Sequence, residues 1–83
     1  MKVTLKLYAT LADYLPQGSR DNRVDIDVSE HQTVGAILDQ YRLPAKLTHL
    51  VLINGLFVPP DARPARTLHA GDHLAVWPPI AGG

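Results

Sequence analysis

Strict alternation of apolar and polar residues marks two segments in the first third of the chain as strands. In KVTLKLY the apolar side chains occupy positions 3, 5 and 7, and in RVDIDVS they occupy positions 24, 26 and 28. A period of two is that of a strand with one face buried and the other in water. Residues 2–8 and 23–29 are therefore predicted to be two half-buried strands.

The segment TVGAILDQYRLP has the period of a helix instead. Thr33 suits an N-cap, Pro44 ends the segment, and the apolar residues between them follow the spacing i, i+3, i+4 and i+7: Val34, Ile37, Leu38 and Tyr41. Gly35 costs a helix up to ~1 kcal/mol relative to alanine. We expect a close approach of helix and sheet to require this glycine.

The other elements follow from turn signals. Residues 9–15 have helical spacing and stop at Pro16, and Asn54-Gly55 within HLVLINGLFV predicts a type I′ hairpin between two strands. A loop over 59–72 leads to a final strand in HLAVWPP. The order strand, short helix, strand, main helix, hairpin, strand predicts an α+β domain of the β-grasp (ubiquitin-like) type, with a mixed sheet on one main helix.

Composition limits what such a domain can do. The 83 residues are 46% apolar, carry eight basic and eight acidic side chains, and include no cysteine. The balanced charge argues against nucleic acid or an anionic membrane as a partner, and no apolar run approaches the ~20 residues of a membrane span. Without cysteine there is no disulfide framework, and we expect a cytoplasmic protein.

Candidate catalytic and metal-binding groups are poorly arranged for chemistry. His69 and His73 are separated by a Gly-Asp turn, and Asp25 and Asp27 lie on a strand without an evident pocket. Solvated side chains are the simpler interpretation of all four. We expect no metal site, no bound cofactor and no catalysis by this chain alone.

The closing sequence WPPIAGG combines features that agree with one another. Two prolines cannot donate ladder hydrogen bonds and favour an extended backbone, so the domain is expected to cover residues 1–77 and an arm to cover 78–83. The arm would reach roughly 20 Å at ~3.3 Å per residue. Its residues suit threading into a narrow channel, with one apolar anchor and little bulk beyond it: Pro78, Pro79, Ile80, Ala81 and Gly82. The carboxylate of Gly83 is then the candidate reactive group.

The last strand predicts where a partner docks. Alternation places Leu74 and Val76 towards the helix, and Ala75 and Trp77 away from it. Residues 50–53 are apolar on both faces, so one pair of them also faces away from the helix. An apolar patch on a small domain indicates an interface. The alternative is that Trp77 folds over the sheet edge and covers the core.

From these residues the chain resembles the MoaD/ThiS family of ubiquitin-like sulfur carriers. The segments LKLYATLADYL, TVGAIL, VLING and TLHAGDHLAVWPPIAGG carry the likeness, which spans nearly the whole length. Pro-Pro ahead of Gly-Gly is most similar to the small subunit of molybdopterin synthase. Trp77 in place of the usual phenylalanine and the loop PPDARPAR are departures from the family pattern.

The resemblance implies a mechanism. An adenylating partner would use ATP to activate Gly83, and a sulfur donor protein would displace AMP to leave a C-terminal thiocarboxylate. The thiocarboxylate would then enter the large catalytic subunit of molybdopterin synthase and donate sulfur to a pterin. Thiamine biosynthesis, conjugation to lysines as a protein modifier, and a pure binding module are the alternatives.

Overall fold

The structure, a computed structural model, describes residues 1–79. Its elements in chain order are β1 (Lys2–Leu7), the 3-10 helix η1 (Ala9–Tyr14), β2 (Arg23–Asp27), α1 (Val34–Gln40), the 3-10 helix η2 (Ala45–Leu47), β3 (Leu50–Ile53), β4 (Leu56–Phe57) and β5 (His73–Trp77). The predicted strands, short helix, main helix and hairpin are therefore all present, and η2 is an additional element.

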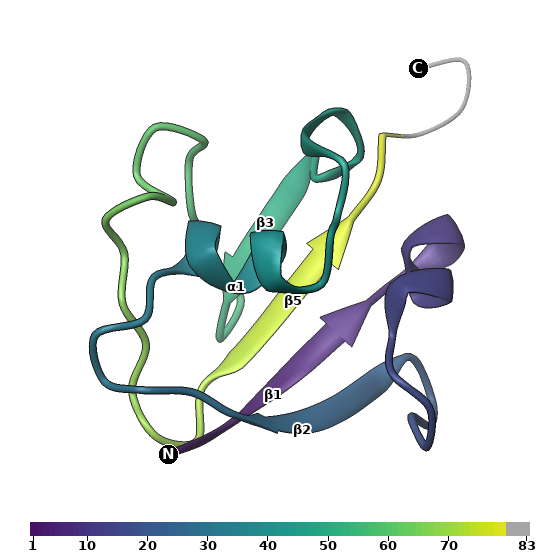
Figure 1. Cartoon of the computed structure of the whole chain (residues 1–83). Helices are drawn as coiled ribbons and strands as arrows, with labels where there is room; N and C mark the ends of the chain where they lie inside the picture. The colour runs from purple at the N-terminus through teal and green to yellow at the C-terminus, as the bar shows by residue number, and fades with distance from the viewer. Residues whose placement is uncertain (80–83) are drawn as a thin grey trace.

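The strands form one mixed sheet of five strands in the order β2-β1-β5-β3-β4. The central pair, β1 and β5, is parallel, and the other pairs are antiparallel. Figure 1 shows α1 crossing one face of this sheet. The α+β, β-grasp architecture expected from the order of elements is confirmed.

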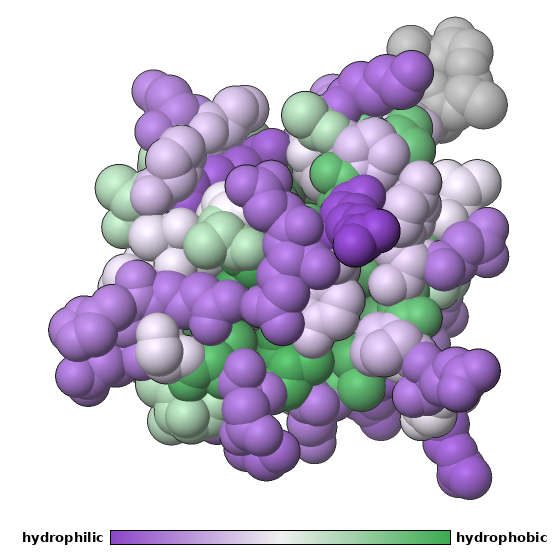
Figure 2. Space-filling view, viewed as in Figure 1, coloured by the Kyte–Doolittle hydropathy of each residue, from purple (hydrophilic) through white to green (hydrophobic). Residues whose placement is uncertain are grey.

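The core lies between α1 and one face of the sheet. The inward strand residues have almost no exposed surface, as do the inward residues of α1: Val3, Leu5, Leu7, Val51, Leu74, Val76, Val34 and Ile37. Figure 2 shows that polar side chains dominate the surface on the side of α1, with apolar surface between them. The alternation in the sequence therefore predicts which side chains of each strand face the core and which face away from it.

The turn of the hairpin between β3 and β4 also contacts the start of β5. Asn54 and Gly55 both have positive φ, 51° and 85°, as a type I′ turn requires. The side chain of Asn54 donates to Asp72 and accepts from the backbone of His73. The hairpin turn is thereby tied to the start of β5.

The helix is shorter than its apolar spacing predicts. It ends at Gln40, and Arg42 takes a left-handed conformation with φ of 59°. The N–H of Leu43 donates to Leu38 O and that of Arg42 to Asp39 O, which are the two bonds of a Schellman motif. Glycine is the usual residue at this position, so an arginine there does not predict the early stop.

The expected reason for Gly35 is wrong. Its backbone approaches the loop over residues 59–66 and not the sheet, since a Cβ there would lie 3.4 Å from both Arg63 O and Pro64 Cα. The N–H of Gly35 also donates to Arg63 O at 2.9 Å. The glycine therefore lets this loop close on the first turn of α1.

Candidate functional site

The root of the C-terminal arm is the end of a central strand. Because β5 pairs with β1 on one side and β3 on the other, its last carbonyl groups are held from both sides. The N–H of Tyr8 donates to Val76 O, and the N–H of His49 donates to Trp77 O, each at 3.1 Å. The backbone therefore leaves the sheet from a fixed position.

An aromatic pair covers this root. The rings of Tyr8 and Trp77 are stacked, with centroids 4.3 Å apart and planes 7° apart. Both side chains are partly buried. Trp77 therefore faces away from α1, as alternation predicts, and lies against a neighbour on the open face instead of folding over the edge into the core.

The backbone after Tyr8 adopts a costly conformation. Ala9 has φ of 52°, the left-handed region that costs a residue with a Cβ about 1 kcal/mol or more. Ala9 is the first residue of η1, directly after Tyr8, which lies between β1 and η1. Strained backbone often accompanies functional sites, and here it lies beside the root of the arm.

The arm itself begins within the described residues. Pro78 is partly buried and Pro79 is exposed, directly beyond the end of β5 at Trp77. Ile80, Ala81, Gly82 and Gly83 lie outside the described residues, and so does the expected reactive carboxylate.

A buried arginine supports the root from the other side. Arg63 is 7% exposed and donates to three backbone oxygens: Val58 O at 3.1 Å, Thr48 O at 2.8 Å and His49 O at 3.2 Å. Burial lowers the pKa of its guanidinium below the usual value. Since the N–H of His49 holds Trp77 O, Arg63 fixes the segment that holds the end of β5.

A hollow of about 610 Å³ lies beside this arginine, between α1 and the loop over residues 59–66. Its charged lining groups are Arg63 and Asp39. The three backbone oxygens that Arg63 bonds already surround its guanidinium with partial negative charge. Such a cation is poorly placed to bind an anion, so we assign the hollow no ligand.

The open face of the sheet carries an apolar patch. Leu50 is 36% exposed and Phe57 is 55% exposed, and both lie on the side away from α1 together with Leu52. Val51 and Ile53 are buried, which settles which pair of β3 faces outward. Ala75, which is 8% exposed, lies at the bottom of this apolar patch.

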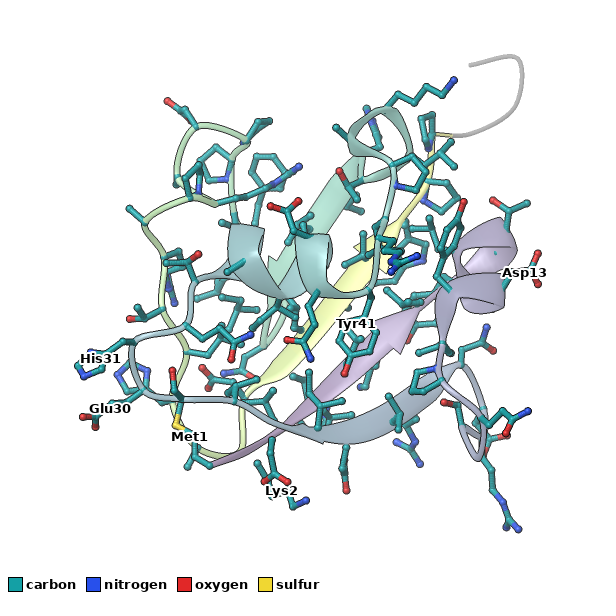
Figure 3. The ribbon with its side chains drawn as sticks, viewed as in Figure 1. Met1, Lys2, Asp13, Glu30, His31 and Tyr41 are labelled. Carbon is teal, nitrogen blue, oxygen red and sulfur yellow. The ribbon has the colours of Figure 1, made fainter. Side chains whose placement is uncertain are left out.

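The remaining polar candidates lie apart from the root. Asp27 pairs with Lys2 at 3.0 Å and Asp25 accepts from the Thr4 hydroxyl at 2.8 Å, all on exposed surface. Figure 3 shows Glu30 and His31 at the edge of the molecule, pointing away from it. Within residues 1–79, no three His, Cys, Asp or Glu side chains gather as a metal site. That part of the chain also has no helix long and apolar enough to cross a membrane.

Sequence reasoning missed Tyr8 and Arg63. Tyr8 ends an alternating run and continues its outward face, so its register beside Trp77 follows once β1 and β5 are known to be parallel neighbours. The burial of Arg63 could not be predicted, because an arginine in a Pro-rich loop is normally expected to be solvated. Only the folded loop shows that this side chain is buried. The end of β5 at Trp77, in contrast, was signalled by the prolines.

Comparison with known proteins places this geometry in a family. A search of curated proteins found no match. Among solved structures, SAMP1 from Haloferax volcanii is 29% identical, with TM-score 0.68 and both chains fully covered. The HVO 2177 protein of the same organism is 28% identical, with TM-score 0.76, all of this chain and 87% of that chain covered.

The likeness to a third solved structure extends to the fold only. The complex of subunits 1 and 2 of the molybdopterin-converting factor from Helicobacter pylori includes a chain 16% identical to this one, with TM-score 0.61 and both chains fully covered. These neighbours agree with the β-grasp fold that the sequence predicts. Residues 1–81 match the Mut7-C ubiquitin family, and the chain is a member of that family.

Proposed function

We propose that this protein is a sulfur carrier whose reactive group is the carboxylate of Gly83. The carboxylate oxygen attacks the α-phosphorus of ATP in an activating partner, and pyrophosphate leaves. The terminal sulfur of a persulfide on a donor protein then attacks the acyl carbon and displaces AMP, which gives an acyl disulfide between carrier and donor. A thiol attacks the donor's sulfur in this disulfide, so the S–S bond breaks, the thiol and the donor form a disulfide, and the carrier leaves with the outer sulfur. The carrier thus ends in a thiocarboxylate, and it needs no cofactor and no thiol of its own, consistent with its lack of cysteine.

The observation that carries this proposal is the fixed root of the arm. The carbonyls of Val76 and Trp77 are each held by an N–H from a neighbouring segment, and Pro78 and Pro79 cannot continue the ladder. A rigid base with a thin arm suits delivery of a chain end into the active site of another protein. A domain used only for binding would not require such a base.

Molybdopterin synthesis is the pathway that we propose. The similarity in fold to a chain of the molybdopterin-converting factor complex supports a carrier that acts as the small subunit of molybdopterin synthase, in the cytoplasm where ATP is available. The large catalytic subunit would receive the arm and supply the groups that bind the pterin. Trp77, with Ala75 beside it at the bottom of the apolar patch, would face this partner.

Protein modification is the second candidate. The structure of small archaeal modifier protein 1 from the same Haloferax species is 28% identical and covers 95% of this chain. The same adenylated Gly83 would then be attacked by the amine of a lysine, which displaces AMP and leaves an isopeptide bond. Covalent ladders on other proteins, absent when Gly83 is deleted, would favour this candidate over sulfur transfer.

The direct test uses the chain with its activating enzyme and ATP. Deletion of Gly83, or Gly82→Val, is expected to abolish adenylation and sulfur transfer with an unchanged melting temperature, because both lie beyond the last strand. His31→Ala, on the exposed loop between β2 and α1, is the control and should retain wild-type rates. A Gly83-deleted protein that still accepts AMP and sulfur would refute the mechanism.

A further inference from the structure

The turn of the hairpin formed by β3 and β4 is held at the start of β5. The side chain of Asn54 donates to Asp72 and accepts from the backbone N–H of His73, each at 2.9 Å. The backbone N–H of Asn54 also donates to His73 O at 2.9 Å. This end of the hairpin therefore fixes the first residue of β5, at the end of the strand remote from the arm.

Arg63 holds the open end of the same hairpin. Its guanidinium donates to two carbonyl groups that precede β3 and to one that follows β4: Thr48 O, His49 O and Val58 O. The backbone N–H of His49 in turn donates to Trp77 O at 3.1 Å. One guanidinium thus ties together both ends of the hairpin, directly beside the last residue of β5.

The burial of Arg63 is costly for the fold. The side chain is 7% exposed, and the ion pairs within residues 1–79 involve other groups, so no carboxylate there offsets its desolvation. An apolar side chain at a buried ionic site is often at least as stabilising. It cannot, however, hold three carbonyl groups in the plane of a guanidinium. We take this placement of the carbonyl groups to be what Arg63 supplies.

We propose that Arg63 is a positioning residue for the reaction at Gly83. Its bonds fix the backbone of His49, the N–H of His49 fixes Trp77 O, and the arm leaves the sheet after Trp77. An error at this root is carried along the arm, and misplacement of a reacting group by about 1 Å can slow a reaction about 100-fold. The inference rests on the proposed function and assigns a role in it to a side chain buried within the domain.

The test is single-turnover transfer of AMP from ATP to the chain by its activating enzyme, followed by intact mass. The maximum rate reports delivery of the carboxylate, and the enzyme concentration that gives half this rate reports docking. The test variants are Arg63→Lys, which keeps the charge but not the planar fork, and Arg63→Met, which keeps the apolar length without any donor. A thermal melt is recorded for each variant.

The matched control is Asp72→Ala, at the opposite end of the same hairpin and of β5. It removes the acceptor of the Asn54 side chain, so it destabilises the fold but leaves the root of the arm intact. Amide hydrogen exchange, followed residue by residue by NMR, measures both ends, through the N–H of His49 at the root and that of Asn54 at the turn. The N–H of Tyr8, which donates to Val76 O from β5's other neighbour, is the internal reference.

Both Arg63 variants are expected to lower the maximum rate of AMP transfer at least about tenfold, with an unchanged half-saturating enzyme concentration. Exchange at His49 should become at least about tenfold faster relative to Tyr8, because local opening at the root becomes easier, and exchange at Asn54 should not. Asp72→Ala should show the reverse pattern of exchange and transfer AMP at the wild-type rate.

Each other outcome overturns a defined part of the account. If the wild type is adenylated and the Arg63 variants match its rate, the inference is wrong and the proposed function stands. The same follows if Asp72→Ala slows transfer equally, since lost stability then explains the effect, or if only the half-saturating concentration changes, since docking is then what depends on Arg63.

Two further results concern the route and the fold. A slower rate without faster exchange at His49 would refute the route through the root of the arm. If both Arg63 variants are unfolded at the assay temperature, the arginine serves the fold and the inference is wrong. If the wild type accepts no AMP, the inference and the proposed function both fall.

Discussion

Tyr8 stacks on Trp77 at 4.3 Å with nearly parallel rings, so the residue after β1 covers the last residue of β5. The same Tyr8 donates its N–H to Val76 O. One residue therefore holds both the backbone and the side chain at the root of the arm. Trp77 is the only tryptophan of the chain, so its fluorescence reports on this contact.

Tyr8→Ala should expose Trp77 and loosen the root. We expect its emission to shift to the red and the free energy of unfolding to fall by about 2 kcal/mol, combining lost apolar burial with the aromatic pair. Tyr8→Phe retains the stacked ring and should match the wild type within about 0.5 kcal/mol. Unchanged emission in Tyr8→Ala would show that the stack does not form in solution.

Ala9→Gly should stabilise the protein. The left-handed φ of 52° at Ala9 strains a residue with a Cβ, and glycine removes that strain while it increases the entropy of the unfolded chain. The net expected gain is about 0.5 kcal/mol in urea unfolding. Ala12→Gly, within the same 3-10 helix but without positive φ, is expected to destabilise instead, and a loss in both variants would contradict the strain.

Acid should destabilise the protein through Asp72. Burial opposes ionisation of this carboxyl, but the hydrogen bonds from the His69 N–H and the Asn54 side chain and the charges of His69 and Arg66 outweigh it and lower the pKa. A folded pKa below the unfolded value contributes stability that is present above the unfolded pKa, about 3.9. This contribution is lost as pH falls through the folded pKa.

Urea unfolding over a pH series measures this effect. Asp72→Asn should lose about 2 kcal/mol at neutral pH and show a shallower loss of stability in acid. Asn54→Gly keeps the left-handed turn but removes one donor, so its acid transition should begin at higher pH than that of the wild type. An Asp72→Asn protein with the full acid sensitivity of the wild type would refute the role of this carboxyl.

Phe57 and Leu56 provide a matched test of the open face. Phe57 opposes Leu52 on the open face, whereas its neighbour Leu56 opposes the buried Ile53 and points to the other side. Phe57→Ser should weaken binding to the large synthase subunit by about 2 kcal/mol, as loss of an aromatic anchor does. Leu56→Ser should leave the affinity unchanged in titration calorimetry. Equal effects of both substitutions would contradict docking at this face.

Much of the fold could be predicted because alternation and helical spacing define which faces are buried. The strands, the type I′ turn at Asn54-Gly55 and the outward direction of Trp77 follow from local pattern. The features that were missed depend on contacts distant in sequence. The contact of Gly35 with the Arg63 loop and the aromatic pair at Tyr8 both require the tertiary fold.

The identity of the reactive group is the central claim, and an intact mass spectrum of the protein purified from its own host tests it most directly. The account predicts a fraction of molecules that end at Gly83 with one oxygen replaced by sulfur, and tandem spectra that place the sulfur on Gly83. Only the unmodified mass, in cells with an active sulfur donor and activating enzyme, or a polypeptide that continues past Gly83, would contradict it.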